Sequence, residues 1–200
     1  FVTEDEGPRV EMWQYSDAGL SLLTTFDNGG ESEGCVYDDE NRRLFISEEE
    51  TNGVLKAYNI DRVLDFSNFT TVDSRKGNIV GDPEGVAIYK TNDRDGFIVL
   101  SSQGDSKFNL YDRKPPYQYV GSFSVKAGLG ATALPIDEIT TTDGIEVINL
   151  DFNNHFPEGL MVIQDDVNTV DKESKLKRQN FKLVSFRDII NALSLITAAD

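Results

Sequence analysis

The stretch Asp82-Pro83-Glu84-Gly85-Val86-Ala87-Ile88-Tyr89 joins two acidic residues to an apolar run. A polar turn at 91–96 follows, and a second apolar run, Phe97-Ile98-Val99-Leu100, then leads into Ser101-Ser102-Gln103-Gly104. Two apolar runs around a polar turn predict a β-hairpin. Because a hairpin begins and ends at the same edge, we expect Asp82, Glu84 and Gln103 to form a cluster of oxygen ligands.

The same arrangement occurs three times along the chain. An acid followed by glycine stands at positions 33, 84 and 143, so the spacings are 51 and 59 residues. Each copy continues with two apolar runs around a turn, and the second run leads to Glu49, Gln103 or Asp165. Repeats of about 50 residues that are built from antiparallel strands, with no helical crossover, are typical of a β-propeller.

The remaining segments fit an all-β fold. Two strands are predicted before the first complete copy, from Arg9 to Tyr15 and from Leu20 to Phe26. Apolar residues with helical spacing between Phe186 and Ile196, after a possible N-cap at Ser185, predict a short C-terminal helix on the last blade. A β-sandwich is the alternative fold, but it gives no reason for the same acid at the same strand start.

Composition narrows the classes of partner. The 200 residues and the 38% hydrophobic content suit one folded domain. The net charge of −16, from 35 acids and 19 Lys and Arg residues, argues against nucleic acid or an anionic membrane as a partner. A single cysteine and a single histidine exclude an intrachain disulfide and a Cys- or His-rich zinc site. Oxygen ligands favour Ca²⁺ if a metal binds.

The repeat predicts where such a metal would bind. If the units radiate from an axis, six side chains converge at one mouth of a central channel, namely Glu33, Glu49, Glu84, Gln103, Asp143 and Asp165. Carboxylates at such short distances raise one another's pKa or destabilise the fold unless cations balance their charge. A single Glu-Gly pair would indicate only turn chemistry, but three copies in register favour a functional site.

Four further features of the sequence have their own interpretations, namely Cys35, His155, the loop at 126–142 and the basic run at 172–178. Cys35 occupies the position of Val86 and Ile145 in the other copies, so it is expected to be a buried small hydrophobe. His155 lies in a predicted hairpin turn and is expected at the surface. The loop at 126–142, which carries Asp137, is long enough to be functional, and the basic run at 172–178 is predicted to be a solvated turn.

These motifs resemble those of the β-propeller phytases, also called alkaline or calcium-dependent phytases, and the order and spacing hold from about residue 10 to the end. The matching pieces are Glu33-Gly34, Ile46-Ser47-Glu48-Glu49, Asp82-Pro83-Glu84-Gly85, Ser101-Ser102-Gln103-Gly104, Tyr111-Asp112-Arg113, Thr142-Asp143-Gly144-Ile145, Val162-Ile163-Gln164-Asp165 and Gln179-Asn180-Phe181-Lys182-Leu183-Val184. The resemblance implies a six-bladed propeller in which residues 1–200 supply roughly the last three to four blades of one domain. Blade-like units would lie near 1–60, 61–125 and 126–200.

The resemblance also implies an activity, which is calcium-dependent hydrolysis of phytate (inositol hexakisphosphate) by a phosphatase of the 3-phytase type. The substrate would be the calcium complex, and bridging Ca²⁺ ions would activate a water. The implied catalytic-site calcium ligands are Glu33, Glu49, Asp82, Glu84, Gln103 and Asp143. Asp137, Asp165 and Asn168 would belong to a further, structural calcium site, although the acidic ligand expected there is Val167 in this chain.

Several expectations follow from how this chain differs from the family. Family members are longer, and their basic and histidine residues that grip substrate phosphates lie mostly in an N-terminal half that the chain does not match. A Lys-Glu pair that ends that half corresponds to Asp5-Glu6 here. The remaining blades are expected from further residues or another chain, unless the molecule is an atypical relative. An extracellular or periplasmic location is what the family implies.

Two alternatives to a phytase-type hydrolase stay open. One is a non-catalytic calcium-binding propeller that serves as an interaction or structural module. The other is a propeller hydrolase of the lactonase type, which shares acid-lined metal channels.

Overall fold

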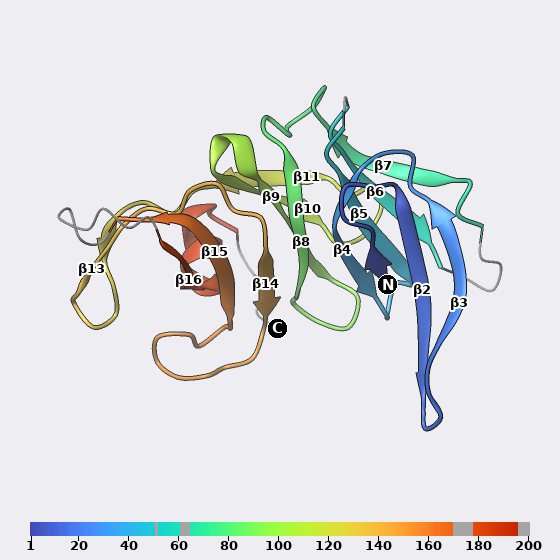
Figure 1. Ribbon diagram of the computed structural model, residues 1–200. Helices are drawn as coiled ribbons and strands as arrows, with labels where there is room; N and C mark the ends of the chain where they lie inside the picture. Colours follow the sequence, from blue (N-terminus) through green and yellow to red (C-terminus); the bar gives the residue numbers. More distant parts are fainter. Residues whose placement is uncertain (51, 61–64, 170–177, 196–200) are drawn as a thin grey trace.

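The computed structural model describes residues 1–50, 52–60, 65–169 and 178–195. This part of the chain is mostly β, as the sequence predicts, with antiparallel sheets and one short α-helix near its C-terminal end (Figure 1). None of its helices is long and apolar enough to cross a membrane.

Strand order within each larger sheet follows the chain. The first sheet contains β1 (Val2–Thr3), β2 (Arg9–Ser16) and β3 (Gly19–Asp27). The second contains β4 (Ser32–Asp38), β5 (Arg43–Glu48), β6 (Val54–Asn59) and β7 (Phe69–Ser74). The third contains β8 (Pro83–Lys90), β9 (Gly96–Ser102), β10 (Lys107–Asp112) and β11 (Tyr119–Phe123), with the short 3-10 helix η1 (Gln103–Asp105) after β9. The last contains β14 (Ile145–Ile148), β15 (Leu160–Asn168) and β16 (Arg178–Ser185).

Strand pairing confirms the three predicted hairpins, since β4 pairs with β5, β8 with β9 and β14 with β15. The register shifts between Ser32 and Cys35 in β4, and between Pro83 and Val86 in β8. The acid-glycine pairs at 33 and 84 therefore lie at β-bulges. A bulge bends the strand and redirects its side chains, and bulges are common next to active sites.

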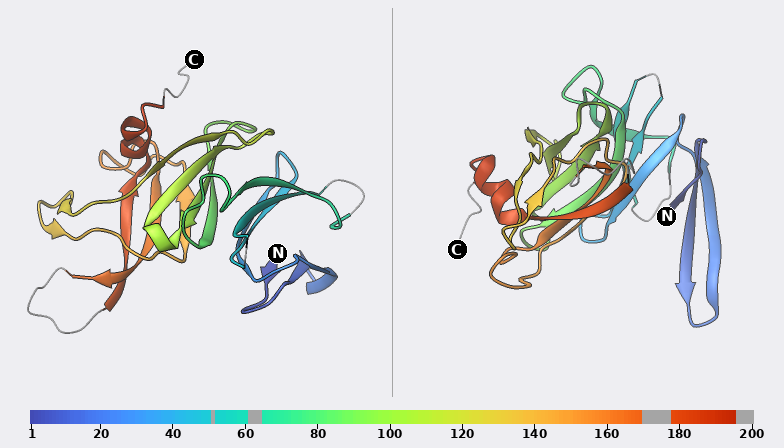
Figure 2. Two further views of the ribbon diagram at one scale, coloured as in Figure 1. Left: turned by 90° about the horizontal axis from the view of Figure 1, so that it is seen from above. Right: turned by 60° about the vertical axis from the view of Figure 1, so that its left-hand side comes forward.

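Each sheet packs face to face against the next. Val86 and Ile88 of β8 belong to a core shared with the second sheet, whereas Ala87 and Tyr89 belong to a core shared with the last sheet and the helix. Successive strand residues point to opposite faces, so a strand covered on both faces has a continuous apolar run. The described residues thus form a series of sheets rather than the two layers of a sandwich, and Figure 2 shows this succession from above.

The strands β4, β8 and β14, here called the inner strands, lie side by side in the middle of the molecule (Figure 1). Their backbones meet at the acid-glycine pairs, where the N–H of Gly85 donates to the carbonyl of Asp143 at 2.8 Å. A Cβ on Gly34 would lie 2.7 Å from the carbonyl oxygen of Glu84, and a Cβ on Gly85 would lie 2.4 Å from that of Asp143. Gly144 has no such neighbour within 4 Å.

Some elements were not predicted from the sequence. β7 and β11 add a fourth strand to two sheets, and the predicted loop at 126–142 contains a small hairpin, β12 (Gly128–Leu129) with β13 (Pro135–Ile136). The predicted helix is confirmed as α1 (Phe186–Ala192), which packs on the last sheet although the Ser185 hydroxyl makes no capping bond. Ile196 and most of the predicted basic turn lie outside the described residues.

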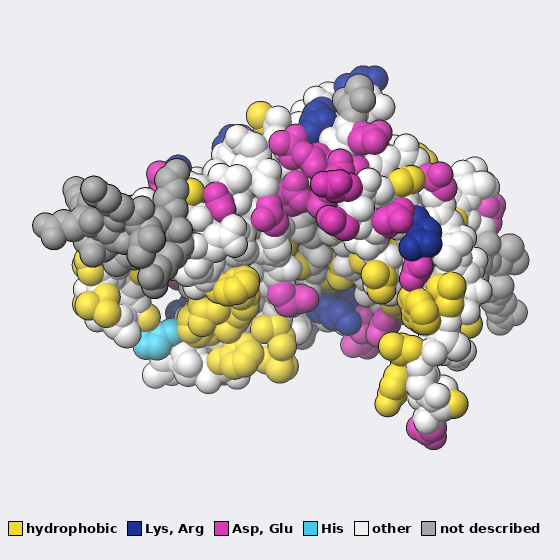
Figure 3. All heavy atoms as spheres, viewed as in Figure 1, with side chains coloured by type: hydrophobic (Ala, Val, Ile, Leu, Met, Phe, Trp, Pro, Cys, Tyr) yellow, Lys and Arg dark blue, Asp and Glu magenta, His cyan; other side chains and the backbone are white. Residues whose placement is uncertain are grey.

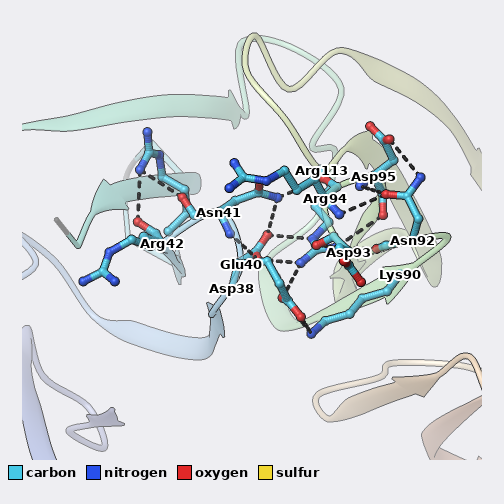
Figure 4. A network of polar contacts seen from close by, with 11 residues as sticks. Asp38, Glu40, Asn41, Arg42, Lys90, Asn92, Asp93, Arg94, Asp95 and Arg113 are labelled. Atoms are coloured by element: carbon cyan, nitrogen blue, oxygen red, sulfur yellow. Dashed lines mark hydrogen bonds and ion pairs between the residues drawn. The ribbon is translucent and has the colours of Figure 1, made fainter.

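A buried ion pair joins the second and third sheets at the end opposite the acid-glycine pairs (Figure 4). Asp38, the last residue of β4, and Arg113, which follows β10, are both fully buried. The Arg113 guanidinium donates to Asp38 Oδ2 at 2.7 Å and to Glu40 Oε2 at 2.7 Å, and Lys90 also binds Glu40, at 2.8 Å. Burial alone would raise the pKa of Asp38, but bonds from Arg113 and Asn41 hold it below its ordinary value.

The glycine contacts predict a difference between two otherwise similar substitutions. Gly85→Ala places a Cβ against the backbone of the next inner strand, so we expect unfolding free energy to fall by about 1–3 kcal/mol. Gly144→Ala meets open space and should change it by less than about 0.5 kcal/mol. Urea denaturation of both variants measures this, and equal losses would contradict the assigned contact.

The ion pair between the sheets predicts a second stability effect. Arg113→Met leaves the Asp38 carboxylate buried without its cation, which typically costs about 3–5 kcal/mol. The double variant Arg113→Met with Asp38→Asn removes both charges and should be more stable than Arg113→Met alone. Chemical denaturation of the two variants distinguishes this pair from an exposed one, for which both losses would be small.

Candidate metal-binding site

Three glutamates converge at the end of the molecule where the inner strands begin. Glu33 lies at the bulge of β4, Glu49 follows β5, and Glu31 precedes β4. One carboxylate oxygen from each residue lies within 4.8 Å of the others, so the predicted proximity of Glu33 and Glu49 is confirmed. Glu31 was missed because it has no counterpart in the repeat.

Glu84 occupies the corresponding bulge of β8, and its side chain belongs to the same group of charges. It is only 6% exposed. Burial, together with the charges of Glu33, Glu49 and Asp143, raises the pKa of Glu84 to about 8. The pKa of Glu33 is also raised, by burial and then by the charges of Glu31, Asp143 and Asp5.

Burial and nearby carboxylates, chiefly Asp82, likewise raise the pKa of Glu49. Figure 3 shows acidic side chains gathered over this end of the molecule. We call the following residues the acidic cluster: Glu31, Glu33, Glu49, Asp82, Glu84, Gln103 and Asp143. The raised pKa values indicate that its charges are not balanced by protein cations.

Asp143 is tied to both neighbouring hairpins. The Gln103 amide donates to Asp143 Oδ1, and the N–H of Asp143 donates to Gln164 Oε1 at 2.9 Å. The backbone N–H of Gln103 donates to the Asp82 carbonyl at 2.8 Å. The start of β14 is therefore held against the end of β9, and the bond to Asp82 places Gln103 at the same edge of its hairpin, as predicted.

Arg75 is a basic side chain at the edge of the acidic cluster. It forms an ion pair with Asp82, and its Nη1 donates to the carbonyl of Glu50 at 2.7 Å. Its charge also lowers the pKa of Glu49, against the larger effects that raise it. Arg75 lies in the β7–β8 connection and has no equivalent in the other copies, so the repeat gave no signal for it.

Glu48 shows that an adjacent acid can have a different role. It is 7% exposed and forms an ion pair with the buried Lys56, whose ammonium lies 4.8 Å from the ring centroid of Phe69. Adjacent strand residues point to opposite faces, so Glu49 enters the acidic cluster while Glu48 is neutralised beneath it. Glu48 therefore has a structural role, whereas Glu49 belongs to the acidic cluster.

Asp137, Asp165 and Asn168 lie apart from the acidic cluster. Asp165 was expected beside Asp143, but it is fully buried, bonded to the N–H of Thr140 at 3.0 Å and paired with Lys182. Its neighbour Gln164 reaches Asp143 instead. As with Glu48 and Glu49, alternation along the strand separates the two side chains.

The remaining candidates follow the sequence-based interpretation. Cys35 is partly buried against a core that includes Val10 and Leu44, and burial raises the pKa of its thiol. His155 lies in the turn between β14 and β15, where its N–H donates to Asn153 Oδ1 at 2.8 Å. Neither arrangement provides a nucleophile or general base.

The acidic cluster fits a hard divalent cation. Its side chains offer carboxylate and amide oxygens from three neighbouring inner strands, which is the donor set that Ca²⁺ prefers. Among the described residues, Arg75 forms an ion pair with the acidic cluster, and its partner there is Asp82. Burial and then mutual repulsion raise the pKa values of Glu33, Glu49 and Glu84, and bound cations would offset both effects.

Comparison with known proteins relates the chain to a protein family and to a curated relative. A family model described as Phytase matches residues 21–199. The chain is also similar to the 3-phytase of Bacillus subtilis (strain 168), with 31% identity over 198 residues, which covers 96% of this chain and 49% of the relative. The chain thus spans about half the length of that relative.

The raised pKa of Glu84 predicts a pH dependence with a definite sign. Without metal, the folded state keeps the Glu84 proton up to about pH 8 while the unfolded chain releases it near 4.5, so stability falls as pH rises through this range. We expect the metal-free melting temperature to fall by about 5 °C between pH 5 and pH 8, estimated from typical melting entropies.

If Ca²⁺ binds at the acidic cluster, it should reverse this trend, because a ligand of the ionised carboxylates stabilises the native state. Thermal melts in chelator and in Ca²⁺ across this pH range, with Glu84→Gln as the control, test the prediction. A metal-free melting temperature that rises toward pH 8, or a Glu84→Gln variant with an unchanged pH slope, would contradict it.

Proposed function

The chain belongs to the phytase family, and from this premise we propose that it forms the calcium-binding part of a phosphatase that hydrolyses phytate. One observation supports the proposal above others. The acidic cluster brings carboxylates together from neighbouring inner strands, and their raised pKa values indicate unbalanced negative charge. Such a site would repel a phosphate ester by itself, but bound cations invert the sign of its field.

The residues of the cluster divide into ligands and groups that position them. Glu33, Glu49 and Glu84 would hold Ca²⁺ together with Asp82 and Asp143. When bound, Ca²⁺ supplies Lewis-acid chemistry, activating a water and screening the phosphate charge. The amide of Gln103 fixes the carboxylate of Asp143, so its orientation is set before any ion arrives.

Arg75 adds a group that can act on substrate. Its side chain is 29% exposed, and its guanidinium is held at the edge of the cluster by Asp82 and the carbonyl of Glu50. Guanidinium groups match the geometry of phosphate oxygens. Arg75 is thus positioned to contact a phosphate next to the ions, while the other phosphate-binding groups would come from outside the described residues.

We propose that further blades complete a propeller beside β14. Gly34 and Gly85 each contact the next inner strand, whereas Gly144 faces open space. The Ser47 hydroxyl donates to the carbonyl of Glu84 in β8 at 2.5 Å, and the Ser101 hydroxyl donates to the carbonyl of Thr142, just before β14, at 2.6 Å. The equivalent position in the last sheet is Ile163, which has no hydroxyl to donate.

Exposed apolar side chains on this side support the same proposal. Ile148, Leu150 and Phe152 are 37%, 56% and 51% exposed, and Figure 3 shows apolar side chains gathered over β14 and the loop after it. Contiguous apolar surface of this kind marks an interface. The six blades implied by the resemblance would cover it.

A second candidate function is a calcium-binding propeller without catalysis. It is favoured by Asp5, whose charge adds to those that raise the pKa of Glu33. An acid here, where the family has a lysine, lowers the positive charge available for phosphate. Calcium would then stabilise the fold without turnover.

We further propose an extracellular or periplasmic location, on the basis of the family. Weak calcium sites suit compartments outside the cytoplasm, where such modules work at about 10⁻⁴–10⁻³ M. Fractionation of the source cells tests this location.

Phosphate release from calcium phytate tests the activity. The chain should be assayed alone and as a chimera that carries the N-terminal half of the Bacillus subtilis relative. We expect release that chelator abolishes and that Glu84→Gln or Asp143→Asn reduces by about 100-fold or more, since lost ligands remove transition-state stabilisation.

Asp17→Asn, which removes one charge from the exposed β2–β3 turn, is the matched control and should leave the rate unchanged. A folded, calcium-saturated chimera that releases no phosphate would refute the phytase proposal. Calcium-dependent melting without turnover would favour the non-catalytic module.

A further inference from the structure

The second calcium site implied by the family resemblance does not have the residues that an ion needs here. Asp165 of β15 and Asp137, which follows β13, both face Lys182 of β16. Lys182 and Asp137 have side chains 7% and 10% exposed, and Asp165 is fully buried. Val167 stands where the resemblance expects an acidic ligand.

Protein donors already occupy the carboxylate oxygens of this site. Asp165 Oδ1 accepts the Thr140 N–H at 3.0 Å, and its Oδ2 contacts the Lys182 ammonium. Asp137 Oδ2 accepts the backbone N–H and the hydroxyl of Thr169, the latter at 2.9 Å, and its Oδ1 lies 2.6 Å from Lys182 Nζ. Ca²⁺ requires six to eight oxygen ligands, so it would have to displace the ammonium.

Asn168 adds one oxygen acceptor, which does not complete a set of calcium ligands. Its Oδ1 is buried and has no hydrogen-bond donor, and Asp137 Oδ1, which faces the Lys182 ammonium, likewise makes no hydrogen bond. One amide oxygen does not compensate for the missing carboxylate at Val167.

The ammonium of Lys182 is surrounded by protein oxygens. It donates hydrogen bonds to Asp165 and, at 3.3 Å, to the Glu138 carbonyl, and it forms an ion pair with Asp137. A buried charge is tolerated when it is paired and hydrogen-bonded in this way. The pKa of Asp137, which burial would raise, is held below its ordinary value by Lys182 and Thr169.

We infer that the last sheet of this chain is held without the calcium ion that the resemblance implies, because Val167 supplies no carboxylate and Lys182 already balances Asp137 and Asp165. The contact joins β15 and β16 to residues 137–140, and this segment leads directly to Asp143 of the acidic cluster. The last sheet is thus held without metal. This inference goes beyond the proposed function, because it distinguishes a structural site that needs no metal from the acidic cluster, which would bind calcium.

Calcium stoichiometry gives the first test. Isothermal titration calorimetry with CaCl₂ compares the wild-type chain with Asp137→Asn and with Glu84→Gln. We expect Asp137→Asn to bind as many ions as the wild type, with affinity unchanged within about threefold, and Glu84→Gln to lose binding at the acidic cluster. Loss of a bound ion in Asp137→Asn would overturn the inference.

Melting in chelator gives the second test. Lys182→Met leaves two carboxylates facing each other without a cation, and we expect the melting temperature to fall by about 10 °C. Lys182→Met with Asp165→Asn removes the buried charge and should recover most of that loss. A Lys182→Met variant that melts like the wild type, or a double variant no better than the single, would refute the role of Lys182.

The two proposals fail separately. If the wild type binds no calcium, the function proposed above is wrong, while the melting comparison still decides whether Lys182 is the cation of the last sheet. If Lys182→Met does not fold, the stoichiometry of Asp137→Asn decides instead.

Discussion

Backbone contact between neighbouring inner strands is the constraint on which the rest of the structure depends. Gly34 and Gly85 lack a Cβ where the next strand's carbonyl passes, so each inner strand can lie directly against the next. The residue before each glycine is an acid, and a β-bulge at 33 and 84 redirects it. Close packing and the convergence of carboxylates therefore have one cause, and the fold cannot bring the sheets together without crowding these charges.

The chain balances three of its other buried acids with its own cations. Asp38 is paired with Arg113, Glu48 with Lys56, and Asp165 with Lys182, and each of these pairs is buried. In the acidic cluster Arg75 engages Asp82, and the other carboxylates crowd one another. A protein with a net charge of −16 has few cations to spare, so the charge left at the acidic cluster is where an external cation contributes most.

Local pattern predicted the strands well, because hairpins depend on neighbours in the sequence. The runs 86–89 and 97–100 pair as expected, and they are continuous because cores lie on both faces of the third sheet. The small hairpin within 126–142 was missed because two-residue strands leave almost no periodic signal. Glu31 and Arg75 were missed because neither repeats, and the contact of Arg75 with Asp82 depends on how one connection folds back.

The sequence by itself determined the all-β architecture, the three hairpins and the oxygen-ligand chemistry, since alternation, turns and residue types are local properties. Only the tertiary structure decided which acids keep their charge unbalanced. Glu48 and Glu49, or Gln164 and Asp165, are adjacent in sequence, yet one of each pair faces the acidic cluster and the other faces away. The difference arises because strand neighbours point to opposite faces, and because the neutralising lysine of Asp165, Lys182, comes from a different strand and reaches it only after the sheet has formed.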